Sequence, residues 1–292
     1  MEIWQAILLG LIEGITEYLP VSSTGHLIVA QRLMGIGTHE GNAKLAADAF
    51  AICIQGGAIL AVLGLYYKYV IRMIKGVFGQ DPEGLKLAIA VLMGFLPAAI
   101  LGLLFNDIIE EKLFGMWPVI AAWIVGGIGI IWTVSWRKKY PPRGNGRDIL
   151  KLAWQSALFI GLLQCVAMWP GTSRSLMTIC GGLIVGLSVT AAVEYSFLLG
   201  VLTLSAATFK KALWHIEGAG PQFETWFGGT KLMWETYGPI PLIAGILAAA
   251  ISAAFAVKWL VTFLQSHGLQ GFGYYRILIG ITVGILVLTE TL

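Results

Sequence analysis

Residues 13–26 read EGITEYLPVSSTGH, and they interrupt an apolar N-terminal segment with two carboxylates and a helix break. A carboxylate in the hydrocarbon region of a membrane costs about 2.5–3.5 kcal/mol on insertion scales. Glu13 and Glu17 lie four residues apart, so their side chains share one face of a helix. A chain that accepts this cost twice uses the two groups for chemistry or transport.

The composition of the whole chain is typical of an integral membrane protein. It is 57% hydrophobic and 12% charged, about half the charged fraction of a soluble domain. Several windows nearly free of charge have about the length that a helix needs to cross a membrane; they are residues 87–105, 116–136, 240–257 and 277–289. The sequence predicts an all-α polytopic membrane protein. A formal net charge of only +3 gives no indication of a nucleic-acid partner.

The placement of the charges predicts the orientation in the membrane. Residues 137–151 carry six Lys and Arg side chains against the single Asp148. Short basic loops stay in the cytoplasm, so this segment is expected inside. The acidic segment 106–112 is expected to form an external loop. With these two loops on opposite sides, the first three predicted transmembrane helices cross the membrane in alternating directions. They are residues 48–66, 86–105 and 116–136.

Residues 1–34 are expected to form a re-entrant hairpin instead of a transmembrane helix. Pro20 cannot continue the first helix, and Ser22 or Ser23 is a good N-cap for a second one. Neither half of this segment is long enough to cross the membrane. Irregular backbone at such depth is tolerated only where it is buried in protein or lines a wet cavity.

The second half of the chain repeats this plan in the opposite orientation. A gapless shift of 151 residues aligns Glu13 with Gln164 and Ser22 with Ser173. We therefore predict an inverted repeat, whose site forms near the midplane where the broken helices meet. Its parts are a first repeat at residues 1–136, a cytoplasmic linker at 137–151 and a second repeat at 152–292. The second repeat comprises a re-entrant hairpin at about 152–187 and helices at about 190–208, 240–260 and 273–290.

The side chains at the two breaks predict an anion site for which phosphate is the natural guest. Two helix N-termini offer unpaired N–H groups, and Arg174 adds a guanidinium suited to bidentate binding. The hydroxyl groups near them belong to Ser22, Ser23, Thr24, Thr172, Ser173 and Ser175. Glu13 and Glu17 would repel a bare phosphate, so they indicate a bound divalent cation or a proton acceptor. His26, one helical turn after Ser23, is a candidate general base or acid.

Each of these groups alone has a structural interpretation. The serines cap backbone, His26 is an interfacial or hydrogen-bonded structural histidine, and Arg174 extends toward the cytoplasmic face or pairs with a glutamate. The three cysteines lie in apolar segments and are expected to be packing residues. Two functional alternatives also use an inverted repeat: an ion-coupled transporter and a polyprenyl-phosphate flippase.

Residues 13–17, 19–26 and 170–175, together with Thr178, resemble the signature motifs of the bacterial undecaprenyl-diphosphate phosphatases. This is the membrane family associated with bacitracin resistance, and the resemblance covers essentially the whole chain. It implies an enzyme that removes the terminal phosphate from the C55 isoprenoid diphosphate and regenerates the carrier for cell-wall synthesis. It also implies an inverted repeat in the bacterial inner membrane, with a site open to the periplasmic or external side, a magnesium or calcium ion, and a homodimer in some members.

Carried over by position, the resemblance implies Ser23 as nucleophile and His26 as the family's histidine. Our hypothesis is that His26 or Glu17 takes the serine proton. It places the glutamate pair, and hence the metal, at Glu13 and Glu17, and the phosphate-binding arginine at Arg174. The phosphate contacts expected around them are Ser22, Thr24, Gly25, Thr172, Ser173, Ser175 and Thr178. Direct attack by water, with the serine only a ligand, stays open. One departure concerns a peripheral position: Ala51 stands where many relatives have a glutamate.

Overall fold

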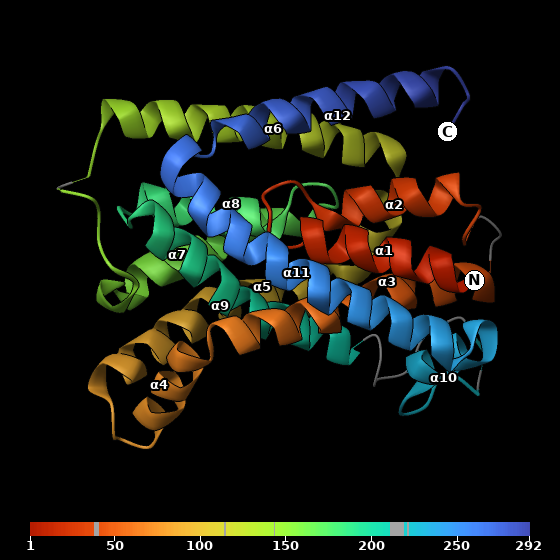
Figure 1. Cartoon of the computed structure of the whole chain (residues 1–292), viewed down its shortest axis with the longest axis horizontal. Coiled ribbons are helices and arrows are strands. Elements are labelled where there is room, and N and C mark those ends of the chain that lie inside the picture. The colour runs from red at the N-terminus through yellow and green to blue at the C-terminus, as the bar shows by residue number, and fades with distance from the viewer. Residues whose placement is uncertain (38–40, 114, 143, 211–218, 221) are drawn as a thin grey trace.

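Six helices long and apolar enough to cross a membrane form the body of the molecule (Figure 1). They are α3 (Asn42–Leu65), the Pro82–Phe105 part of α5 (Pro82–Leu113), α6 (Met116–Lys139), α9 (Val189–Thr208), α11 (Pro239–His267) and α12 (Gln270–Leu288). The computed structural model describes residues 1–37, 41–113, 115–142, 144–210, 219–220 and 222–292, with the backbone alone for 106–112. Within these ranges no β-strand occurs. The prediction of an all-α polytopic membrane protein is confirmed.

Three details differ from the sequence-based expectation. The segment 106–112, expected as a loop, is the continuation of α5, which ends only at Leu113. Two short helices were not expected, α4 (Tyr67–Val77) and α10 (Gly228–Tyr237). Both are too short and too polar to give the apolar signal of a transmembrane span. A prediction based on long apolar segments of the sequence therefore does not include them.

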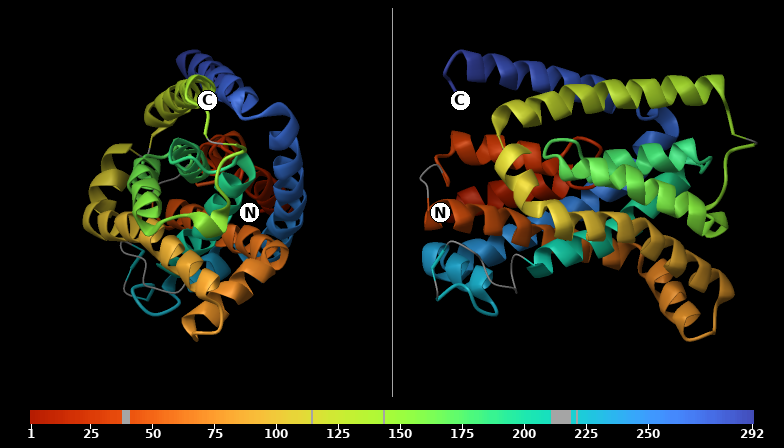
Figure 2. Two further views of the ribbon diagram at one scale, coloured as in Figure 1. Left: turned by 90° about the vertical axis from the view of Figure 1, so that its left-hand side faces the viewer. Right: turned by 180° about the vertical axis from the view of Figure 1, so that it is seen from behind.

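Two helical hairpins approach each other from opposite ends of the molecule, and their loops meet near its centre (Figures 1 and 2). The first consists of α1 (Ile3–Thr16) and α2 (Ser23–Leu33). The second consists of α7 (Trp154–Gln164), a short 3₁₀ turn (Cys165–Met168) and α8 (Arg174–Ile184). None of these helices is long enough to cross a membrane. Their re-entrant character stays a prediction.

The same local geometry starts the second helix of each hairpin. Ser22 and Ser173 are N-caps with positive φ angles of 72° and 79°. The hydroxyl oxygen of Ser22 accepts a hydrogen bond from the Gly25 N–H, and that of Ser173 accepts one from the Leu176 N–H. A positive φ is uncommon outside glycine, and such residues gather at functional sites. The two residues paired by the 151-residue shift thus have one cap conformation.

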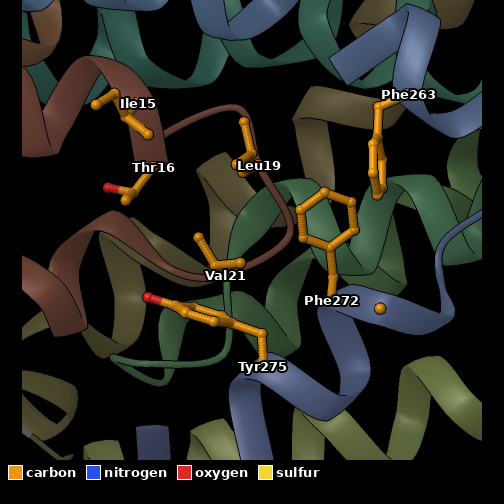
Figure 3. Close-up of a pocket in the computed structure, with 8 residues that line it drawn as sticks. Ile15, Thr16, Leu19, Val21, Phe263, Phe272 and Tyr275 are labelled. Carbon is orange, nitrogen blue, oxygen red and sulfur yellow. The ribbon is translucent and has the colours of Figure 1, made fainter. Parts of the chain in front are cut away.

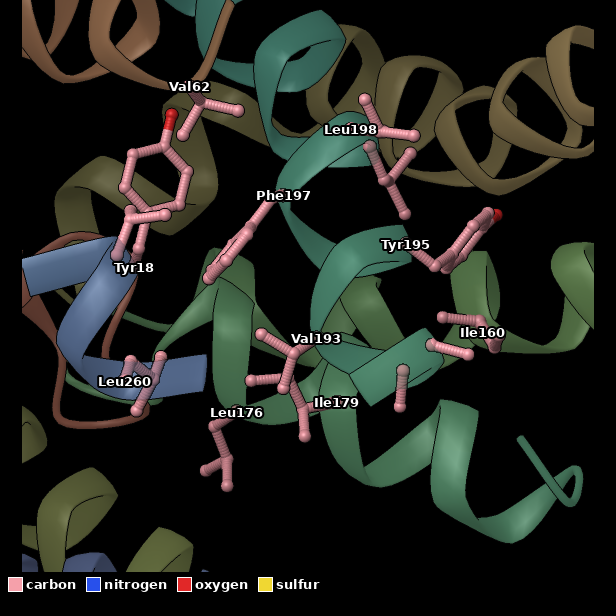
Figure 4. Close-up of a cluster of buried hydrophobic side chains, with 14 of the residues drawn as sticks. Tyr18, Val62, Ile160, Leu176, Ile179, Val193, Tyr195, Phe197, Leu198 and Leu260 are labelled. Carbon is pink, nitrogen blue, oxygen red and sulfur yellow. The ribbon is translucent and has the colours of Figure 1, made fainter. Parts of the chain in front are cut away.

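Close packing of small residues holds the first hairpin in place. α1 packs along α11, and a Cβ atom added at Gly14 would collide with the Ala249 carbonyl oxygen and the Ser252 hydroxyl group. Such close contact between helix backbones is a common source of helix association in membranes. At the loop, the rings of Tyr18 and Phe197 meet edge to face with centroids 5.2 Å apart, within the apolar cluster of Figure 4.

Candidate active site

The carboxylate of Glu17 contacts side chains of both hairpins. Glu17 directly follows α1, and its Oε2 accepts a short hydrogen bond from the hydroxyl group of Ser23, the first residue of α2. Its Oε1 accepts a hydrogen bond from Arg174 Nη2 at 2.9 Å, which is also an ion pair. Glu17 and Ser23 are both buried, at 7% and 5% exposure. A hydroxyl group, a carboxylate and a guanidinium therefore lie in contact in a site of low exposure.

Arg174 is held so that part of its guanidinium stays free for another ligand. Its Nη1 donates to the Ser196 carbonyl at 2.8 Å, and its guanidinium carbon lies 5.4 Å from the centre of the Tyr18 ring. A Cβ atom at Gly200 would collide with the guanidinium, so glycine leaves the space it occupies. Arg174 Nε is buried and has no hydrogen-bond partner among the described residues. An anion is the partner that such a donor fits best.

Glu13 lies one helical turn before Glu17 and is fully buried. Neither of its carboxylate oxygens has a hydrogen-bond partner in the described part of the chain. A buried carboxylate without a partner is costly, so this environment fits a cation or a proton. Magnesium is commonly held by one or two carboxylates, with substrate phosphates and water as further ligands. Glu13 and Glu17 match this pattern in the number of carboxylates, and the described residues contain no group of three or more His, Cys, Asp or Glu that could hold a metal ion.

His26 faces away from the hydroxyl group of Ser23. Its Nδ1 lies 2.6 Å from the Ser22 carbonyl oxygen, and its Nε2 lies 2.7 Å from the Tyr275 hydroxyl oxygen. A carbonyl oxygen only accepts, so Nδ1 carries the proton, and a neutral ring accepts the Tyr275 proton at Nε2. In this arrangement Glu17, and not His26, contacts the proton of Ser23.

The hydroxyl groups of the second hairpin bind other protein atoms. Ser175 Oγ donates to the Leu19 carbonyl at 2.7 Å, which joins the second hairpin to the first loop. Ser173 Oγ lies 2.9 Å from Ser175 Oγ and also caps α8. Thr178 Oγ1 donates to the Arg174 carbonyl at 3.0 Å and lies 2.6 Å from Ser196 Oγ. In this structure these predicted phosphate contacts hold the loops and the arginine in position.

The remaining predicted contacts lie around the same loops. Ser22 acts as the cap of α2, and a Cβ atom at Gly25 would collide with the Trp123 ring, so glycine lets α2 approach α6. Thr24 is half-buried in the first turn of α2, and Thr172 is buried directly before the cap of α8. The structure thus brings all predicted site residues to the two loops or to the helix turns next to them.

Two neighbouring residues of α12 reach the site without having been predicted. Tyr275 hydrogen-bonds to His26, and Arg276 is fully buried against the backbone of both loops. A signal for Arg276 was present, because a charged residue within an apolar helix is by default a candidate functional residue. Tyr275 had no such signal, since its partner lies 249 residues away in the sequence.

An apolar cavity of about 400 Å³ adjoins the first loop (Figure 3). Its walls come from the end of α1, the loop itself, the last turns of α11 and the first turns of α12. Its main lining residues are Thr16, Leu19, Val21, Phe263, Phe272 and Tyr275. Tyr275 belongs both to this wall and to the hydrogen bond with His26, so the cavity lies beside His26 and the first loop.

Comparison with known proteins agrees with this geometry. The model of the family described as bacitracin resistance protein BacA matches residues 6–282. An undecaprenyl-diphosphatase of Sorangium cellulosum is 40% identical over 280 residues, 96% of this chain and 85% of the relative. Undecaprenyl-diphosphatase 3 of Acinetobacter baylyi is 38% identical over 99% of both chains, and undecaprenyl-diphosphatase 2 of Rhodospirillum rubrum is 39% identical over 96% of this chain and 93% of the relative. Since the family model and these relatives extend over nearly the whole sequence, this chain belongs to the bacitracin resistance protein BacA family.

Proposed function

We propose that this protein is a membrane phosphatase that hydrolyses undecaprenyl diphosphate to undecaprenyl phosphate and inorganic phosphate. Several relatives at about 40% identity carry the name undecaprenyl-diphosphatase. The observation that carries the proposal is the double contact of Glu17, with the Ser23 hydroxyl group on one oxygen and Arg174 on the other. A nucleophile, a base and a phosphate-binding group thereby meet at one carboxylate.

Ser23 is the proposed nucleophile and Glu17 its base. Glu17 takes the hydroxyl proton while Ser23 Oγ forms a bond to the terminal phosphorus, and the bond from that phosphorus to the bridging oxygen breaks. Undecaprenyl phosphate leaves with the bridging oxygen. Water then attacks the phosphoserine, which releases inorganic phosphate and restores the serine. The hydrogen bond from Ser23 to Glu17 supports Glu17 as the proton acceptor. Direct attack by water is the alternative, and trapping labelled phosphate on Ser23 distinguishes the two routes.

Arg174 and the two helix N-termini are proposed to bind the terminal phosphate. The first N–H groups of α2 and α8 follow Ser22 and Ser173, where helix geometry leaves donors for an anion. A phosphate offers Arg174 a second acceptor beside Glu17, and the unpartnered Nε adds a donor. A guanidinium that moves from Glu17 to the phosphate leaves the carboxylate free to accept a proton.

Glu13 and Glu17 are proposed to hold a divalent cation, magnesium or calcium. The unpartnered oxygens of Glu13 support this assignment. Such an ion, when bound, neutralises charge on the phosphate oxygens and favours transfer of the phosphoryl group.

The apolar cavity beside Tyr275 is proposed to take the part of the isoprenoid tail closest to the diphosphate. Its volume lies within the range of about 300–1,000 Å³ that small-molecule sites have. A C55 chain is larger than this cavity, so the rest of the tail would extend into the bilayer. The position of the cavity beside the first loop, with Tyr275 on its wall and hydrogen-bonded to His26, supports this placement.

The proposed location is the bacterial inner membrane, with the site open to the external side. The basic segment 137–151 supports a cytoplasmic linker between the repeats, which puts the outer ends of the first hairpin outside. Labelling of single cysteines at Gly35 and Gly144 in intact cells tests this orientation. A homodimer stays a prediction.

The function is tested by phosphate release from undecaprenyl diphosphate with purified protein, with and without magnesium or calcium. We expect cation-dependent release, and a decrease of about 10³-fold in Arg174→Ala, because the group that stabilises the phosphoryl oxygens is lost. Arg72→Ala is the matched control, since Arg72 pairs with Asp81 and Glu83 far from the site. No release by folded protein across cations would favour the transporter or flippase, for which the described residues provide no specific support.

A further inference from the structure

Arg276 is a buried charge with an unusual set of partners. The residue lies in α12 and is fully buried. Its guanidinium donates three hydrogen bonds, all to backbone carbonyl oxygens: Nη1 to Pro20 at 3.2 Å, and Nη2 to Ala122 at 2.9 Å and to Gly171 at 2.8 Å. Among the described residues it has no ion pair with a carboxylate. Burying a charged side chain within a membrane protein costs free energy, so such a residue is expected to have a function.

The two loop carbonyls occupy corresponding positions in the two hairpins. Pro20 precedes the cap Ser22 by two residues, and Gly171 precedes the cap Ser173 by two residues. The third carbonyl, at Ala122, belongs to α6. One side chain therefore binds the same point of both loops and fixes them to a transmembrane helix that belongs to neither hairpin.

α6 is shaped to receive this guanidinium. A Cβ atom at Gly126, one turn after Ala122, would lie 2.9 Å from Cζ of Arg276, closer than real Cβ contacts occur, and 3.0 Å from its Nε. The planar fork of arginine can reach several acceptors at once, which a lysine ammonium on a single stem cannot do in the same geometry.

We propose that Arg276 is a positioning residue that ties the two hairpin loops together and so sets the spacing between Ser23 and Arg174. The catalytic part of this inference rests on the proposed phosphatase function. Ser23 follows the first tied loop and Arg174 the second, with two residues between each bound carbonyl and each of these side chains. A change in the tie moves the nucleophile relative to the group that binds the phosphate, and a misplacement of about 1 Å can cost about 100-fold in rate.

Gly126→Ala is the most specific test, because it displaces the guanidinium while Arg276 and its charge remain. Gly129→Ala is the matched control: it makes the same change one turn further along α6, where an added Cβ meets nothing within 4 Å. We expect Gly126→Ala to lower kcat for undecaprenyl diphosphate about 10- to 100-fold with KM within about threefold. Gly129→Ala should retain the wild-type values.

Arg276→Lys separates geometry from charge. If the fork geometry matters, this variant loses at least as much kcat as Gly126→Ala, whereas full activity in Arg276→Lys would overturn the proposal. Hydrogen exchange in lipid nanodiscs gives a measurement that does not depend on activity. Exchange should become faster in both loops, residues 17–26 and 169–177, in either variant. A wild-type kcat in Gly126→Ala, or faster exchange in only one loop, also contradicts the proposal.

The exchange measurement also separates the two proposals. If the wild-type protein releases no phosphate from undecaprenyl diphosphate, the proposed function fails, but faster exchange in both loops still supports the tie. If the wild-type protein is active and both loops exchange as before in Gly126→Ala and Arg276→Lys, the function stands and the tie is wrong.

Discussion

The loops of the two hairpins share a backbone conformation but present different side chains. Ser22 and Ser173 are both caps with φ near 75°, at 72° and 79°. The residue after the first cap is Ser23, which hydrogen-bonds to Glu17, while the residue after the second is Arg174. The same backbone conformation thus presents a hydroxyl group in one hairpin and a guanidinium in the other. The difference shows that two hairpins with the same cap conformation can place chemically different side chains beside each other.

The two hairpins also differ at a pair of corresponding residues in their first helices. Glu13 and Gln164 correspond under the 151-residue shift, and both are buried. Both carboxylate oxygens of Glu13 lack a partner among the described residues. Gln164 is half satisfied: its Oε1 accepts a long hydrogen bond of 3.5 Å from Thr203, and its Nε2 has no partner among those residues. At this pair of positions the carboxylate therefore belongs to the first hairpin, and the proposed cation site depends on it.

The largest effect is expected where the two loops differ in reactivity. Ser23→Ala removes the proposed nucleophile, and we expect kcat to fall by about 10³- to 10⁴-fold, because the remaining binding groups still stabilise the transition state. Phosphate release from undecaprenyl diphosphate measures this. A Ser23→Ala protein with near wild-type turnover would assign the attack to water.

Ser175→Ala is the control from the second hairpin. Its buried hydroxyl group binds the Leu19 carbonyl, so the expected loss is about 1 kcal/mol of stability and less than about tenfold in kcat. A loss equal to that of Ser23→Ala would show that the two loops share the reactive role, contrary to the comparison drawn above.

A smaller effect is expected from making the first hairpin resemble the second. Glu13→Gln keeps the shape of the side chain and removes its charge, and we expect kcat to fall about 100-fold. The magnesium or calcium concentration for half-maximal activity should rise at least about tenfold, because one of two proposed ligands is weakened. A titration of activity against each cation measures both. An unchanged cation dependence would remove Glu13 from the metal site.

Gln164→Glu makes the reverse change and serves as the matched variant. Its added carboxylate is buried, so the expected result is a lower melting temperature with an unchanged cation requirement. Stronger cation binding in this variant would show that the second hairpin also contributes to the metal site.

The architecture was largely predictable because it depends on local patterns. Apolar length determines the six transmembrane helices, and Pro20 together with the serines after it determines the first break. α4 and α10 were not predicted, because short helices without a long apolar stretch do not give the pattern of a transmembrane helix. The predicted end of α5 is wrong. The acidic residues 106–112 suggest an external loop, but they continue the helix.

The site was predictable only as far as its motifs extend. Glu17, Ser23 and Arg174 stand out by residue type next to a helix break, and the structure brings them into contact. The partners of His26 and Arg276 depend on tertiary packing: Tyr275 lies 249 residues from His26, and Arg276 binds carbonyls 256, 154 and 105 residues away. Every residue has a backbone carbonyl group, so the sequence does not indicate which carbonyl groups Arg276 binds. These contacts can be identified only from a structure.

The smallest expected effect concerns the apolar cavity, which adjoins the first hairpin alone. Its lining comes from α1, the first loop, α11 and α12, with no residue of the second hairpin. Gly271 lies on its wall, and an added Cβ there meets nothing within 4 Å, so Gly271→Leu narrows the cavity without a backbone clash. Because one leucine displaces only part of the tail, we expect KM for undecaprenyl diphosphate to rise about three- to tenfold with little change in kcat. Gly56→Leu on α3, another position with open space, should leave both values unchanged. If Gly271→Leu leaves KM at the wild-type value, the tail lies elsewhere, and the asymmetry between the hairpins is confined to their polar side chains.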